Sequence, residues 1–561
     1  MPVGWRCCIA WRTVLRTLML MATLSLAACG GGSSSGDSSQ LATPAPVTTV
    51  TPTPPASTVT TPSAPSALSA ADVTVAGSLR YESVPSNSTS GALVYSATAA
   101  KPIRGAVVEV YSSPADQLVG TGLSDEAGAY SIKVSDPGAA VFVRVKAQLL
   151  QSTAPGWDIR VADNTQGSAQ YVLDTPAKSV SGSSLTIDAT AATGWTGSSY
   201  GASRSSAPFA ILDSVYRALQ KVRSADPTRA WPRLNLYWSV NNRPAAGDFA
   251  QGSISSTLYA GPDEGGVHQI YVLGRADVDT DEFDKHVITH EFGHYLQRVA
   301  SRNDSLGGSH GSEALDMRVA FSEGWGDGWS TIATEDPVYV DSSGPGQANA
   351  SRFDFSKAPA SGQGWYKSDT VAYLLWKFNE QIGFPSIWQA LAGATTNNSA
   401  VLSNLHLFAV ALKVAAPSKA ATIDSLLANQ RTTAADVYGS TETNSGGIAD
   451  VLPLYKIYGA LGSNQTVCAN VAVGTPDTLN KLGNWAFTRF TAPTTRSYSF
   501  ALTGGSDPDF TLYGVNGFRR LANTSAAGSE TLTVNLNAGE YVIAATEFSL
   551  TGRTCLNLVI N

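Results

Sequence analysis

The sequence predicts a multidomain protein in which an α+β domain lies between two β-sandwich domains. The chain has 561 residues, which is too long for a single hydrophobic core. Apolar residues recur at helical spacing within residues 205–460. The regions on either side, 71–192 and 463–561, contain short β-rich segments separated by turn residues. We therefore expect three folded domains over these three ranges.

Residues 1–28 have the features of an export signal, so they are left out of the predicted fold. Three arginines and no acidic residue precede an apolar run over residues 17–28, which is short for a membrane span. Residues 26–30 read Leu-Ala-Ala-Cys-Gly and resemble the lipobox of bacterial lipoproteins. The resemblance implies cleavage before Cys29, a lipid on its thiol, and anchoring in the outer membrane, facing the periplasm or the cell exterior. The alternative is an ordinary secretory signal.

Residues 29–70 are predicted to form a disordered tether. They are mostly Gly, Ser, Thr, Pro and Ala, and such a segment buries too little apolar surface to offset the entropy of ordering it. The whole chain has a formal net charge of -7, and the signal segment contributes only positive charge. The remainder is therefore acidic, which argues against nucleic acid as a partner.

The first folded region, 71–192, is predicted to be rich in strands. Residues 106–111 are β-rich, and residues 129–134 alternate apolar with polar or small side chains after a turn. The stretch 101–130 resembles carboxypeptidase regulatory-like domains, which are small transthyretin-like β-sandwiches. This resemblance implies a non-catalytic domain, and a prodomain, a spacer and a substrate receptor all stay open.

The last region, 463–561, contains three clear predicted strands at 509–513, 530–536 and 539–545. Their sequence and order resemble the pre-peptidase C-terminal domain of secreted bacterial proteases, which implies a jelly-roll-like β-sandwich. Asp507 and Asp509 offer carboxylates to a cation such as Ca²⁺, but acidic residues at such positions more often only form turns. The sequence does not support a calcium site there.

The cysteine content favours one disulfide in an oxidising compartment. There are five cysteines. Cys7 and Cys8 leave with the signal, and Cys29 is expected to carry lipid. Cys468 and Cys555 remain and are expected to pair, with two separate buried thiols as the alternative.

The middle region, 205–460, is predicted to contain both helices and strands. Its expected helices lie at about 210–222, 281–299, 369–381, 386–392 and 403–414, and its expected strands lie at 234–238 and 269–273. Acidic residues at the start of the 281–299 segment suit a helix N-terminus.

The expected helix 281–299 contains His290-Glu291-Phe292-Gly293-His294, an H-E-x-x-H motif. Residues four apart share one face of a helix, so both imidazoles can bind one metal ion. The glutamate beside the first histidine can then reach a water molecule on that ion and act as its base. Catalytic zinc sites use three protein ligands, so a third ligand is required.

A suitable third ligand follows in Glu323-Gly324-Trp325-Gly326-Asp327. On a second helix, the first of these residues supplies a carboxylate, and the last, one turn later, can orient a metal-binding histidine. H-E-x-x-H followed by E-x-x-x-D is the pattern of gluzincin metallopeptidases, and the second motif is most similar to that of the fungalysin family. The resemblance implies one catalytic Zn²⁺ and an endopeptidase-like mechanism.

Three further residues are possible members of the zinc site. His286 shares a helix face with the motif, but binding by three successive turns is geometrically poor, so a structural role is favoured. His310 lies in a glycine-rich loop between the two motifs and is a candidate for oxyanion stabilisation or substrate binding, and less so for third ligand. Tyr366 is a candidate oxyanion stabiliser, with a packed aromatic as the alternative.

The sequence therefore predicts a secreted, lipid-anchored zinc hydrolase that cleaves a protein or peptide substrate. His290, His294 and Glu323 are the expected ligands, Glu291 the base and Asp327 their support. One alternative is a surface binding or adhesion protein with a structural or relic zinc site. Against it, Glu291 is intact although it adds nothing to metal binding. A zinc amidase acting on cell-wall bonds is the other alternative.

Overall fold

The computed structural model describes residues 72–561, except 312, 471–478 and 523–527. The predicted export signal, the lipidation site Cys29 and the tether lie outside the described residues. Residues 72–561 form one compact unit. No helix in the described part of the chain is both long enough and apolar enough to cross a membrane.

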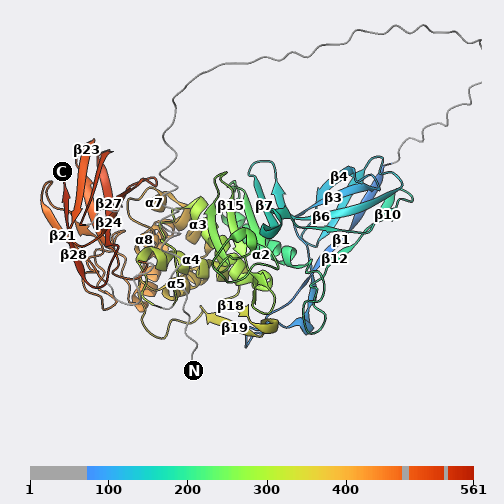
Figure 1. The fold of residues 1–561 in the computed structure, drawn as a ribbon, viewed down its shortest axis with the longest axis horizontal. Helices are drawn as coiled ribbons and strands as arrows, with labels where there is room; N and C mark the ends of the chain where they lie inside the picture. The colour runs from blue at the N-terminus through green and yellow to red at the C-terminus, as the bar shows by residue number, and fades with distance from the viewer. Residues whose placement is uncertain (1–71, 312, 471–478, 523–527) are drawn as a thin grey trace, which may run out of the picture. The chain divides into compact units, whose positions relative to one another are not determined.

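The largest sheet contains ten strands from two regions of the sequence. They are β3 (Ala106–Ser113), β4 (Leu118–Leu123), β6 (Ala140–Gln151), β7 (Trp157–Asp163), β8 (Ala169–Gln170), β9 (Val172–Asp174), β10 (Lys178–Ser179), β13 (Leu234–Trp238), β14 (Leu258–Pro262) and β15 (His268–Val272). The main path runs β14-β15-β13-β7-β6-β3-β4 (Figure 1). β7 and β13 pair in parallel, with Leu234 opposite Ile159 and Leu236 opposite Val161. The sheet is therefore continuous across residues 193–204, where the sequence suggested a domain boundary.

A second sheet packs against the first part of this large sheet. It joins β1 (Val73–Ser83) to β2 (Ala99–Pro102), β5 (Ala129–Val134), β11 (Ser184–Thr186) and β12 (Ala189–Ala191). The alternation read from residues 129–134 is present, because Tyr130, Ile132 and Val134 are buried and their neighbours are exposed. A Cβ added at Gly120 of β4 would lie 2.7 Å from the Ile132 side chain. The two sheets therefore face each other over a shared apolar layer.

The helices follow in the middle of the chain. They are α2 (Ala207–Ala225), α3 (Lys285–Ala300), α4 (Met317–Thr334), α5 (Ser368–Gln381), α6 (Phe384–Ala392), α7 (Ala394–Asn397), α8 (Leu405–Ala415) and α9 (Ala420–Asn429). α4 packs against both α3 and α5. Gly324 permits the second contact, because a Cβ there would lie 2.4 Å from Cβ of Val371 in α5. Glycine weakens a helix, so close packing explains its use here.

A small four-stranded sheet lies next to the start of α3. It is formed by β16 (Gly274–Arg275), β17 (Asp279–Thr280), β18 (Val338–Ser343) and β19 (Asn349–Asp354) in that order. The short helix η4 (Asp281–Phe283) joins β17 to α3. Asp284, at the N-terminal cap position of α3, does not cap the helix with its side chain. Its carboxylate accepts hydrogen bonds from Ser342 N and Oγ at 2.9 and 2.7 Å, which ties α3 to β18.

The C-terminal region consists of two sheets. One contains β20 (Lys456–Ile457), β22 (Ala486–Ala492), β24 (Pro508–Tyr513), β25 (Arg519–Ala522) and β27 (Gly539–Glu547); the other contains β21 (Asn464–Ala469), β23 (Arg496–Thr503), β26 (Ser529–Leu536) and β28 (Thr554–Ile560). Phe500 and Leu558 of one sheet and Phe510 and Ile543 of the other belong to a single buried cluster. The region is thus built as a β-sandwich, as expected.

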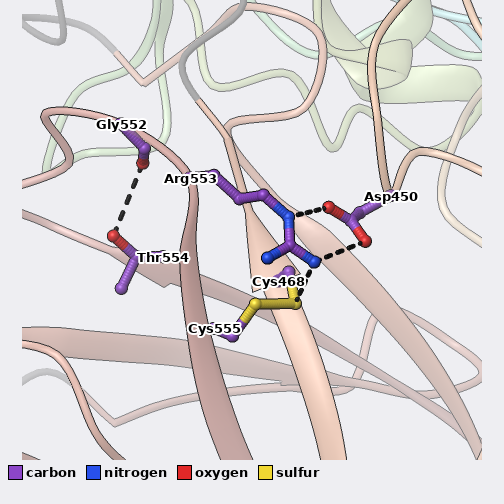
Figure 2. Close-up of a disulfide and its surroundings, with 6 residues drawn as sticks. All are labelled: Asp450, Cys468, Gly552, Arg553, Thr554 and Cys555. Carbon is purple, nitrogen blue, oxygen red and sulfur yellow. Dashed lines mark hydrogen bonds and ion pairs between the residues drawn. A yellow bond between two sulfur atoms is a disulfide. The ribbon is translucent and has the colours of Figure 1, made fainter.

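The predicted disulfide between Cys468 and Cys555 is present and joins β21 to β28. The two cysteines stand opposite each other in the antiparallel ladder. Figure 2 shows the Arg553 guanidinium between the disulfide and Asp450. This contact connects the sandwich to the loop that precedes it.

The structure confirms the mixed α+β class with β-sheet layers. Each expected helix and strand of the middle region has a counterpart within a few residues. The expected helix 281–299 is observed as η4 followed by α3, because Asp284 between them adopts a non-helical backbone.

Candidate metal centre

Two helices bring together three side chains that could hold a metal ion. α3 presents His290 and His294 one turn apart, and α4 presents Glu323. One ligand atom of each residue lies within 4.8 Å of the others, and all three residues are buried. The sequence spacing placed the histidines on one face, and the packing of α3 on α4 adds the carboxylate.

Two of the three distances between these donor atoms match a tetrahedral zinc ion, and the third is slightly shorter. The Nε2 atoms of His290 and His294 are 3.1 Å apart, and Glu323 Oε2 lies 3.5 and 3.4 Å from them. Two donors on a tetrahedral zinc with bonds of about 2.0–2.2 Å are about 3.3–3.6 Å apart. The chemistry of the donor set, two imidazoles and a carboxylate, fits a catalytic zinc site as well.

Asp327 fixes the orientation and the tautomer of His290. The Nδ1 atom of His290 lies 2.9 Å from Asp327 Oδ1. A carboxylate accepts hydrogen bonds, so Nδ1 carries the hydrogen and the Nε2 lone pair points at the centre. The ring also packs on Gly326, where an added Cβ would lie 2.7 Å from the His290 Cε1 atom. The glycine inside the second motif therefore makes room for the ligand.

His294 is oriented by Ser322, a residue that the sequence reading did not single out. Ser322 Oγ lies 3.1 Å from Gln297 Oε1 and 3.3 Å from His294 Nδ1. The serine hydroxyl donates to the glutamine oxygen, so its oxygen accepts from the imidazole Nδ1–H. Nε2 of His294 is thereby left with its lone pair, as at His290. In the sequence, only its position next to Glu323 indicated that Ser322 lies near the centre.

The electrostatics of the centre favour positive charge at its middle. Burial alone would lower the pKa of His290, but hydrogen bonds with Asp327 and Glu323 raise it well above the ordinary value. Burial would raise the pKa of Glu323, yet the charge of His294 and hydrogen bonds with both histidines hold it well below its usual range. Positive charge on protonated imidazoles compensates the buried Glu323 carboxylate, and a divalent cation held by the neutral imidazoles would do the same.

Glu291 is buried beside these ligands and is held by the main chain of an edge strand. Its Oε2 accepts a hydrogen bond from Tyr259 N of β14 at 2.7 Å. Burial raises the pKa of Glu291, although the charges of His290 and His294 act in the opposite direction. A raised pKa makes a carboxylate a better proton acceptor at neutral pH. Nothing in the sequence pointed to Tyr259, because the contact uses only its backbone.

His310 lies at the edge of the centre. Its Nε2 is 3.2 Å from Glu323 Oε2, its Nδ1 is 3.1 Å from the carbonyl oxygen of Gly308, and its side chain is 37% exposed. The loop between the two motifs thus brings a third imidazole, that of His310, next to the Glu323 carboxylate. Oxyanion stabilisation, substrate binding and metal binding by His310 stay predictions.

Tyr366 is placed in a packed aromatic environment. It is buried, its ring contacts that of Trp365, and its hydroxyl donates to Asn444 Oδ1 at 3.1 Å. His286 is fully buried, its Nε2 lies 3.2 Å from the carbonyl oxygen of Asp336, and burial lowers its pKa to about 4. These contacts are those of structural residues. A role for Tyr366 in oxyanion stabilisation stays a prediction without support from a contact to the centre.

Tyr339 is a neighbour of the centre that the sequence reading missed. It belongs to β18, and its ring meets the His290 ring edge-on with centroids 6.2 Å apart. Burial and the nearby carboxylates of Asp327 and Asp341 raise its pKa well above the ordinary value, so its hydroxyl stays protonated. The chain contains 20 tyrosines, and nothing in the local sequence distinguishes this one.

Comparisons with known proteins give only distant likenesses. No family model and no curated protein matches the chain. The precursor of protealysin, a metalloproteinase from Serratia proteamaculans, aligns with a TM-score of 0.29 and 12% identity over 50% of this chain and 88% of its own. The pre-peptidase C-terminal domain of a Bacillus anthracis collagenase aligns with a TM-score of 0.15 and 9% identity over 19% of this chain and 94% of its own.

CorA, a surface-associated copper-binding protein of Methylomicrobium album BG8, aligns with a TM-score of 0.15 and 6% identity over 19% of this chain and 96% of its own. At such scores these likenesses establish neither a family nor an activity for this chain.

Proposed function

We propose that the protein is a zinc metallopeptidase that hydrolyses peptide bonds. The observation that carries the proposal is the convergence of His290, His294 and Glu323 at the spacing of zinc ligands, with Glu291 buried beside them. A zinc ion held by these residues would polarise a carbonyl group and lower the pKa of water. The fungalysin-like second motif supports the endopeptidase subclass.

In this proposal each residue of the centre has a separate role. His290 and His294 direct their Nε2 lone pairs at the metal position because Asp327 and Ser322 hold the opposite nitrogens. Glu291 accepts the proton of the attacking water and passes it to the leaving amine. His310 is close enough to the centre to donate a hydrogen bond to a bound substrate.

The substitution Glu291→Gln tests the reaction. It removes the base but no metal ligand, so zinc content should stay at one ion per chain while casein hydrolysis falls by at least about 10³-fold. The measurement pairs metal analysis with hydrolysis for residues 30–561. Glu335→Gln is the matched control, because its side chain is 77% exposed at the end of α4.

Retained hydrolysis in Glu291→Gln would reject the mechanism. Zinc without hydrolysis of any protein by the unsubstituted chain would favour a binding or adhesion protein. Release of products from cell-wall material alone would favour the zinc amidase.

We also propose that the enzyme is held at the outer membrane by a lipid on Cys29, with residues 29–70 as its tether. The support is the lipobox-like sequence. Mass spectrometry of the N-terminal peptide from cells should show a diacylglyceryl group on Cys29, and an unmodified thiol or a start at another residue would contradict the anchor.

A further inference from the structure

A second group of carboxylates lies outside the zinc centre. Asp279, Asp281 and Asp341 each offer one oxygen, and these oxygens lie within 4.8 Å of one another. The residues come from β17, η4 and β18, so segments about sixty positions apart in the sequence meet here. Calcium binds oxygen ligands at about 2.3–2.6 Å, so two ligands of one ion are at most about 5 Å apart. The spacing of the group fits one coordination shell.

The group also has buried oxygens that no hydrogen bond satisfies. Asp281 is 2% exposed, and its Oδ1 accepts no hydrogen bond within the described residues. Its Oδ2 accepts one from Thr257 Oγ1. Asp279 Oδ1 is likewise buried and without a hydrogen-bond partner in the described part of the chain. A buried carboxylate oxygen without a partner is costly unless a proton or a cation compensates it.

The charges around the group do not supply that compensation. Burial, together with the charge of Asp279, raises the pKa of Asp341 to about 7, and burial raises the pKa of Asp279 to about 6. Asp284 adds a further buried carboxylate, whose pKa burial and Asp341 raise. Another acidic neighbour, Glu282, is already paired with Arg204. Carboxylates crowded in this way are the usual environment of a hard divalent cation.

We propose that Asp279, Asp281 and Asp341 bind a calcium ion. Backbone carbonyls and water can complete the six to eight oxygen ligands that calcium accepts. The ligand chemistry excludes a second zinc site of the kind formed by α3 and α4, because it contains neither nitrogen nor sulfur donors.

The ion would connect three segments that surround the zinc centre. Asp281 begins the short helix that leads into α3, and its partner Thr257 directly precedes β14, whose Tyr259 holds Glu291. Asp341 lies two residues after Tyr339 in β18, on the same side of the strand, and Tyr339 packs on His290. Calcium would therefore fix the backbone that positions the zinc ligand and the base. This consequence rests on the proposed function, whereas calcium binding itself does not.

The test measures calcium binding directly. Residues 30–561 are dialysed against calcium-free buffer and titrated calorimetrically with calcium chloride, and separately with magnesium chloride. We expect one calcium ion per chain and a melting temperature raised by about 2 °C or more at saturating calcium. Asp281→Asn should weaken calcium binding at least tenfold and abolish the thermal shift. Asp116→Asn, which removes one exposed carboxylate elsewhere, should behave like the unsubstituted chain.

The direction in which Asp281→Asn changes the melting temperature without calcium distinguishes a calcium site from a cluster that only stabilises the fold. In calcium-free buffer, Asp281→Asn removes a repelled charge, so it should melt at or above the unsubstituted chain. If this variant does not fold, Asp341→Asn provides the same comparison. No calcium binding by the unsubstituted chain, equal binding by the aspartate variants, or magnesium binding of equal strength would overturn the proposal. Hydrolysis is not a readout, so failure of the proposed peptidase would leave this result unaffected.

Discussion

At the scale of single residues, the proposed zinc centre depends on which nitrogen of each imidazole carries the hydrogen. Asp327 sets this for His290, and Ser322 with Gln297 sets it for His294. Asp327 was predictable from the sequence because it follows Glu323 by one helical turn. Ser322 and Tyr259 were not, since a hydroxyl or a main-chain amide acquires its role only through packing.

Replacing Asp327 should weaken zinc binding in graded steps. Asp327→Ala removes the hydrogen bond to His290 Nδ1, so the zinc dissociation constant should rise about 10–100-fold. Asp327→Asn keeps an acceptor oxygen and should have a smaller effect. Competition with a fluorescent chelator measures both, and Asp424→Asn on the exposed face of α9 is the control. Equal affinity in all four proteins would show that Asp327 does not orient the ligand.

At the scale of elements, the segments that carry the motifs were predictable, because helical spacing and the H-E-x-x-H pattern are local signals. The pairing of β7 with β13 was not. The segment 234–238 was expected to be a strand, but nothing in it specifies a parallel neighbour about seventy positions away. For the same reason the sequence did not predict the carboxylate group of β17, η4 and β18. Local pattern identifies elements, and long-range packing decides which of them meet.

The shared sheet makes a prediction about truncation. A chain of residues 193–561 lacks β7, so β13 keeps β15 but loses its other ladder partner, and Leu234 and Leu236 lose the buried neighbours Ile159 and Val161. We expect this chain to aggregate or to lack a cooperative thermal transition. A chain of residues 72–561, which removes only the segment before β1, should melt like residues 30–561. Cooperative folding of 193–561 would instead show that residues 71–192 form a separate domain.

At the scale of the whole molecule, the described residues place one candidate catalytic centre among β-sheet layers. β14 of the ten-stranded sheet holds Glu291, and β18 of the four-stranded sheet packs on His290. The C-terminal sandwich has its own buried cluster and its own disulfide. The centre therefore draws its ligands from two helices and their support from sheets on different parts of the chain.

The zinc ligand set can be observed by anomalous diffraction from crystals of residues 30–561, recorded at the zinc absorption edge. We expect one strong peak within about 2.0–2.2 Å of His290 Nε2, His294 Nε2 and a carboxylate oxygen of Glu323. A zinc ion coordinated by His310 instead of Glu323 would contradict the proposed ligands. The absence of any peak between α3 and α4 in zinc-loaded crystals would contradict the zinc centre itself.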